Sequence, residues 1–154
     1  ARLMNEMYPK LRRNDYKIVY EIRNFDLEEA RRLIHETPEK LSVDEIYKVA
    51  GSYEQGSKEY DFAIETAAKV YPTDVPAMVN YVRHLVAEGK LNEALSELQR
   101  SKRDDKDIQA VEGYVYLLKG EYDVARGFIE AAAAAGSEDA KHNLAELDKY
   151  EQSL

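Results

Sequence analysis

A six-residue pattern recurs three times along the chain, each time 31 residues further on. It reads KEYDFA at residues 58–63, GKLNEA at 89–94 and GEYDVA at 120–125, with a weaker echo at 25–30. Periods of about 20 to 50 residues are typical of repeat proteins, in which one unit cannot bury its apolar face alone and stacks on its neighbours. The chain is therefore expected to fold as an array of small, similar units.

Apolar residues before and after each hexapeptide are spaced by three or four positions, as at Val79, Val82 and Val86. This spacing is typical of amphipathic α-helices. Gly89 and Gly120 separate two such stretches, at points where glycine can adopt the left-handed backbone that ends a helix. Each unit is thus interpreted as a helical hairpin. Helices are expected at residues 26–36, 42–54, 58–70, 76–88, 90–102, 107–119, 121–135 and 138–151.

Side chains at the predicted helix ends fit this interpretation. Asp26, Ser42 and Ser57 each stand before a first turn that contains acidic residues, as expected of N-caps. The last predicted helix is apolar on one face and polar on the other, which suits a helix that caps the end of a stack. Its apolar residues are Ala140, Leu144, Leu147 and Tyr150.

Small residues recur at positions where the two helices of a hairpin are expected to cross. Helix axes that approach to about 8–10 Å leave no room for large side chains at the crossing point. We assign this packing role to Gly51 and Gly113 in first helices, and to Ala63, Ala94 and Ala125 in second helices.

These features together resemble the tetratricopeptide repeat (TPR). The resemblance covers about 110 residues and is clearest at residues 107–135, good at 75–101 and looser at 41–72. In the clearest unit, the residues that match the TPR pattern are Gly113, Tyr116, Gly120, Tyr122, Ala125 and Ala132. The chain departs from the family in its 31-residue period, against about 34, and in Val82 where glycine is usual. The resemblance implies an all-α fold, a right-handed stack of antiparallel hairpins, and a role in protein–protein interaction without catalysis.

The resemblance also implies a groove lined by the first helix of each hairpin. Lys48 and Arg83 are expected to hold a peptide carboxylate there, and Tyr114 to give an amphipathic contact. Alternatively, the apolar Val79 and Ala110 meet the N-terminal helix or a second domain. The chain carries twelve tyrosines, of which most are assigned to helix packing. The candidate groove residues are Lys48, Ser52, Val79, Arg83, Ala110 and Tyr114.

Charge divides the chain into two parts, residues 1–24 and 25–154. The first part carries six basic and three acidic residues, a balance of +3, whereas the second carries 16 basic and 27 acidic residues, a balance of −11. An acidic domain repels phosphate backbones, so a nucleic-acid partner is not expected. No apolar stretch is long enough to span a membrane as a helix.

The basic N-terminal part contains a strand pattern. Residues 15–23 alternate, with Tyr16, Ile18, Tyr20 and Ile22 on one face. A lone strand has unpaired edges, so either a symmetry copy pairs with it to form a homodimer, or its sheet lies upstream in a longer protein. The start at Ala1, without an initiator methionine or signal peptide, favours a fragment of such a protein.

A helix, a basic loop with Arg12 and Arg13, and a final strand are also similar to the closing unit of OmpA-like peptidoglycan-binding domains. In some envelope proteins of the Bacteroides group such a domain precedes TPR-like helices. This resemblance, over about 23 residues, implies a location in the cell envelope, periplasmic or associated with the outer membrane. It assigns no peptidoglycan binding to these residues.

No motif for catalysis or for a cofactor is found in the sequence. Neither a nucleophile elbow, nor a Walker loop, nor a dinucleotide-binding fingerprint occurs, and there is no cysteine. The histidines His35, His84 and His142 lie far apart, and none is interpreted as one member of an i, i+4 ligand pair. We therefore expect no enzyme activity, no cofactor and no metal site.

Two functions remain open from the sequence. The first is an interaction module that offers its groove to a protein or peptide. The second is a structural spacer or self-association element, paired through the N-terminal strand or an exposed helix face. The charged run at residues 102–107 is interpreted as a loop between repeats, with a docking epitope as the alternative.

Overall fold

The computed structural model describes residues 25–154, which form an all-α fold. Every expected helix is present, and the bounds agree within one residue except that α3 and α6 end three and four residues early. No β-strand occurs within residues 25–154. The elements are α2 (Leu27–Glu36), a 3-10 helix η1 (Pro38–Lys40), α3 (Val43–Gly51), α4 (Lys58–Val70), α5 (Val75–Ala87), α6 (Leu91–Leu98), α7 (Lys106–Leu118), α8 (Tyr122–Ala134) and α9 (Glu138–Gln152).

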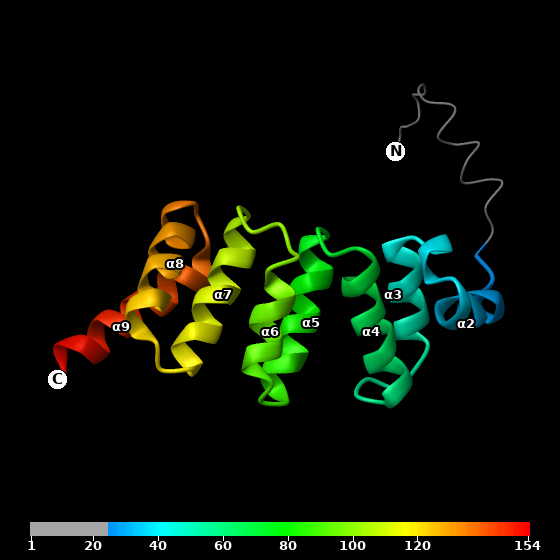
Figure 1. Ribbon diagram of the computed structural model, residues 1–154, viewed down its shortest axis with the longest axis horizontal. Helices are drawn as coiled ribbons and strands as arrows, with labels where there is room; N and C mark the ends of the chain where they lie inside the picture. Colours follow the sequence, from blue (N-terminus) through cyan, green and yellow to red (C-terminus); the bar gives the residue numbers. More distant parts are fainter. Residues whose placement is uncertain (1–24) are drawn as a thin grey trace, which may run out of the picture.

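The helices stand side by side in an elongated row, with α2 at one end and α9 at the other (Figure 1). Three pairs form hairpins, α3 with α4, α5 with α6, and α7 with α8, and each hairpin contacts the next. Helix α9 packs against α8 and also reaches α7. None of the helices in the described part of the chain is both long and apolar enough to cross a bilayer.

The expected N-terminal strand at residues 15–23 lies outside the described residues. The same holds for the OmpA-like segment at 1–24 and for a homodimer formed through the strand. The cell-envelope location rests on that segment, so it stays a prediction.

The predicted caps at Asp26, Ser42 and Gly89 are confirmed in detail. The Asp26 carboxylate accepts hydrogen bonds from the amides of Glu28 and Glu29, at 3.0 and 3.2 Å. Ser42 forms a reciprocal capping box with Glu45 at the start of α3. Gly89 has a φ of +79°, and the next amide, of Lys90, donates to the Leu85 carbonyl at 2.8 Å. Such a left-handed turn favours glycine and satisfies a carbonyl at the end of α5.

Small residues lie where the hairpin helices cross. Ala63, Ala94 and Ala125 are all fully buried. A Cβ placed on Gly113 would lie 2.7 Å from Ile129 Cγ1 and 3.3 Å from the carbonyl oxygen of Ala125. Helices α7 and α8 therefore approach as closely as they do because position 113 has no side chain.

Gly51 departs from this expected role. It lies exposed at the C-terminal end of α3, and a Cβ there would meet no atom within 4 Å. Packing in the α3–α4 hairpin therefore does not require glycine at position 51.

The charged run at residues 102–107 supports the start of α7. The Asp105 carboxylate accepts hydrogen bonds from the amides of Asp107 and Ile108 and so caps this helix. The Arg103 guanidinium pairs at 2.9 Å with Glu112, whose side chain is only 1% exposed. A carboxylate buried in this way is costly unless it is paired, so Arg103 has a structural role in this loop.

We predict that Gly113→Ala destabilises the protein although alanine is the better helix former. Overpacking typically costs about 1–3 kcal/mol, which exceeds the gain of about 0.5–1 kcal/mol from replacing glycine within a helix. Gly127→Ala in α8 is the matched control, because a Cβ there meets no atom within 4 Å. Urea denaturation should show a loss for Gly113→Ala and none for Gly127→Ala. Equal stability of the two variants would contradict the close crossing.

We also predict that Arg103→Ala destabilises the protein by about 1–3 kcal/mol, because it leaves the Glu112 carboxylate buried without its partner. Lys102→Ala removes a neighbouring exposed cation and should change the free energy of unfolding by less than about 0.5 kcal/mol. Denaturant titration of both variants checks this. If both variants lose the same free energy of unfolding, the buried Glu112 carboxylate is not stabilised by Arg103.

Candidate functional site

A groove of about 810 Å³ runs between α5, α7 and α9. Its size falls in the range of binding pockets, and apolar side chains make up most of its lining. We call it the α5–α7–α9 groove. Its main lining residues are Val75, Val79, Val82 and Val86 from α5, Ala110, Val111 and Tyr114 from α7, and Asp139, His142 and Asn143 from α9.

The floor of the groove follows from the spacing of valines along α5. Residues three or four apart share one face of a helix, so the valines of α5 form a continuous apolar stripe beside α7. Val79 and Ala110 are almost completely buried, whereas Tyr114 is 43% exposed. The floor is therefore closed by packing of α5 on α7, and Tyr114 offers an aromatic ring to solvent at its side.

Charged side chains lie at the rim of the groove. Arg83 Nη2 on α5 lies 3.9 Å from Asp139 Oδ2 on α9, and both side chains are mostly exposed, at 64% and 81%. A ligand that pairs with Arg83 therefore competes with Asp139 for it. Because both groups are well solvated, this competition costs little.

The structure brings together four of the six predicted groove residues, namely Val79, Arg83, Ala110 and Tyr114. The other two, Lys48 and Ser52, lie against the N-terminal end of the row. Lys48 Nζ lies 5.0 Å from the centre of the Phe25 ring. Arg31 on α2 donates hydrogen bonds to both the hydroxyl and the carbonyl oxygen of Ser52, at 3.2 and 3.1 Å.

Lys48 and Ser52 are therefore corrected from groove residues to residues of the α2–α3 contact. The physical reason is that α2 packs against α3 and covers the face of α3 on which Lys48 and Ser52 lie. The expectation that Lys48 and Arg83 together hold one carboxylate loses its basis, because only Arg83 lies in the groove.

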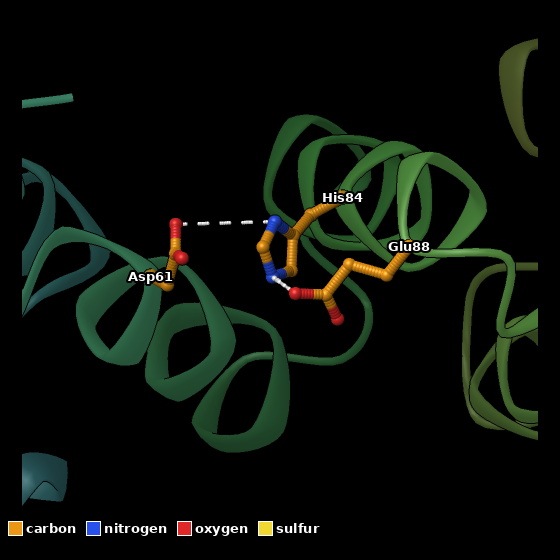
Figure 2. A group of neighbouring side chains, drawn as sticks. All are labelled: Asp61, His84 and Glu88. Carbon is orange, nitrogen blue, oxygen red and sulfur yellow. Dashed lines mark ion pairs between the residues drawn. The ribbon is translucent and has the colours of Figure 1, made fainter. Parts of the chain in front are cut away.

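A second group of ionisable side chains lies between α4 and α5, and the sequence pattern did not indicate it. His84 stands between the carboxylates of Asp61 and Glu88 (Figure 2). His84 Nδ1 lies 3.9 Å from Asp61 Oδ1, and Nε2 lies 3.3 Å from Glu88 Oε2. His84 therefore has a carboxylate partner at i+4, Glu88, which the interpretation of the three histidines left out. That spacing was visible in the sequence, whereas the approach of Asp61 was not.

Asp61 and His84 also line a cavity of about 510 Å³. Tyr47 and Asn80 lie on its wall, where the Asn80 amide donates a hydrogen bond of 3.2 Å to the Tyr47 hydroxyl. Burial raises the pKa of Tyr47 despite this hydrogen bond, so its hydroxyl stays protonated near neutral pH. This cavity is smaller and more polar than the α5–α7–α9 groove.

Neither a protein-family model nor a curated protein matches this chain.

We predict that Asp139→Asn changes the free energy of unfolding by less than about 0.5 kcal/mol, because its ion pair with Arg83 is exposed. Denaturant titration at low salt checks this, with the half-buried pair of Arg103 and Glu112 as the contrast. A loss as large as that of Arg103→Ala would show that the rim pair holds α9 in place.

Proposed function

We propose that residues 25–154 are a non-catalytic protein–protein interaction module that binds a peptide segment of a partner in the α5–α7–α9 groove. We further propose that the hairpins stack with the right-handed sense of TPR proteins. The observation that carries the proposal is a groove of about 810 Å³ with an apolar floor, an exposed aromatic ring and charged groups at its rim.

The chemistry of the groove defines the ligand. Val82 and Val79 are buried in the floor, whereas Val75 and Val86 of α5 are partly exposed. These two valines offer apolar area to one or two aliphatic side chains, and burial of that area supplies the driving force. The Tyr114 ring adds contact area, and its hydroxyl reaches solvent. Arg83 on the rim suits an acidic group of the peptide. Asp107 and Asp139 also line the groove and repel further acidic groups. We therefore expect a short, mainly apolar peptide with one acidic group opposite Arg83.

Selection from a displayed library of random peptides tests this proposal, followed by affinity measurements on synthetic peptides. Tyr114→Ser is expected to weaken binding about tenfold or more, because aromatic anchors commonly contribute above 1 kcal/mol to binding. Tyr150→Ser is the matched control, because Tyr150 is similarly exposed on α9 and stands outside the groove lining. Failure to select any peptide, or equal loss in both variants, would contradict the proposal.

A second function, self-association, is favoured by a separate observation. Exposed apolar side chains gather at the C-terminal end of the row, where the rings of Tyr122 and Tyr150 lie 5.3 Å apart. Leu118 and Val124 are also exposed, at the end of α7 and the start of α8. Exposed apolar patches of this kind often mark interfaces.

Sedimentation at several protein concentrations tests self-association. If this surface forms a dimer, the apparent molecular mass of the wild type rises with protein concentration, whereas the Val124→Asp variant stays monomeric. A wild type that is monomeric at every concentration contradicts this second function and leaves the groove proposal intact.

A further inference from the structure

The cluster of Asp61, His84 and Glu88 has the composition of a metal site. One donor atom of each residue lies within 4.8 Å of the other two, and within residues 25–154 this is the only such group of three or more histidine or acidic side chains. Imidazole nitrogen and carboxylate oxygen are both ligands of zinc and of other first-row divalent ions.

The backbone positions the three side chains. Glu88 follows His84 by four residues at the end of α5, so one helical turn brings both side chains to the same face. Asp61 lies in the first turn of α4, shortly after the N-cap Ser57. Helix α4 packs directly against α5, so the contact between two hairpins brings Asp61 to the ring (Figure 2).

The charges of the cluster favour a cation. Within the described chain, His84 is the one ion-pair partner of the Asp61 carboxylate. Glu88 uses Oε2 toward His84 and Oε1 toward Lys90, at 3.2 Å. Apart from the imidazole, Lys90 is the one cation that pairs with these two carboxylates in the described chain. The three side chains are only 28–41% exposed, so solvent screens this negative charge incompletely.

We propose that Asp61, His84 and Glu88 bind a first-row divalent metal ion of the Zn²⁺ type. Zinc lies about 2.0–2.2 Å from nitrogen and oxygen ligands, so tetrahedral ligand atoms stand about 3.4 Å apart. His84 Nε2 and Glu88 Oε2 already have nearly this separation, at 3.3 Å. The ion binds on this side of the ring. Asp61 Oδ1 faces the other ring nitrogen, Nδ1, at 3.9 Å, so the Asp61 side chain rotates toward Nε2 to join the ligand set when the ion binds.

The surroundings provide for the remaining coordination. The cavity of about 510 Å³ beside Asp61 and His84 has room for water ligands on the ion. Arg83 lines the same cavity, but its guanidinium lies next to Asp139 at the rim of the α5–α7–α9 groove. The ion joins the first hairpin to the second through side chains of both, so binding stabilises the contact between α4 and α5. This inference does not depend on the proposed peptide binding.

Calorimetric titration of the 154-residue chain with ZnCl₂ at neutral pH tests the site. The wild type is expected to bind one ion, and its thermal midpoint is expected to rise with zinc. Loss of a residue that only supports a ligand typically weakens metal affinity about 10- to 100-fold, so His84→Gln and Asp61→Asn are each expected to weaken it at least about tenfold. The thermal shift should be lost with the affinity.

Two further variants serve as controls. His142→Ala removes an exposed histidine from α9, outside the cluster, and is expected to bind zinc within about twofold of the wild type, since it is not a ligand. Lys90→Ala removes the cation that competes for Glu88 and is expected to bind zinc at least as tightly as the wild type.

The proposal is overturned if the wild type binds no zinc at a saturable site. It is also overturned if His84→Gln or Asp61→Asn binds as the wild type does, or if His142→Ala abolishes binding. Circular dichroism of each variant confirms that its helices are intact, so a loss of zinc binding cannot be attributed to unfolding.

Discussion

Within residues 25–154, each helix buries its apolar face against neighbouring helices in the row. A single hairpin has two broad faces and no core of its own, so the free energy of burial comes from helix–helix contacts within and between hairpins. At Gly113 the contact between α7 and α8 is so close that α8 leaves no space for a Cβ. Small residues at such crossings set the distance between helices, and that distance sets the width of every groove beside them.

The two proposed binding surfaces follow from this arrangement. The α5–α7–α9 groove exists because α5 and α7 come from neighbouring hairpins and α9, which packs mainly against α8, also reaches α7. The cluster of Asp61, His84 and Glu88 exists because α4 of one hairpin meets α5 of the next. Neither surface belongs to a single repeat, so both depend on the stacking of hairpins.

Local features of the structure could be predicted from the sequence. Helix positions follow from apolar spacing, and the caps at Asp26 and Ser42 follow from short polar side chains before acidic first turns. The burial of Ala63, Ala94 and Ala125 follows from the repeat period. These features depend on residues close in sequence, which the pattern reveals directly.

Contacts between distant residues could not be predicted in the same way. The sequence did not show that Arg31 of α2 would bind Ser52, or that Lys48 would lie over Phe25, since α2 precedes the regular repeats. Gly51 was assigned to the crossing of α3 and α4 from its position in the 31-residue repeat. However, α3 ends at Gly51, and a Cβ there would meet no atom within 4 Å. Asp61 and His84 are 23 residues apart in different hairpins, so only the packing of α4 on α5 joins them.

The central claim is that neighbouring hairpins together build a peptide-binding groove. Methyl NMR during titration with a peptide selected from the library tests it most directly. The account predicts that the largest shifts fall on the methyl groups of Val79, Val82 and Ala110, while those of Val43 and Val124 stay unchanged. Shifts centred on Val124, or no methyl shifts at saturating peptide, would contradict it.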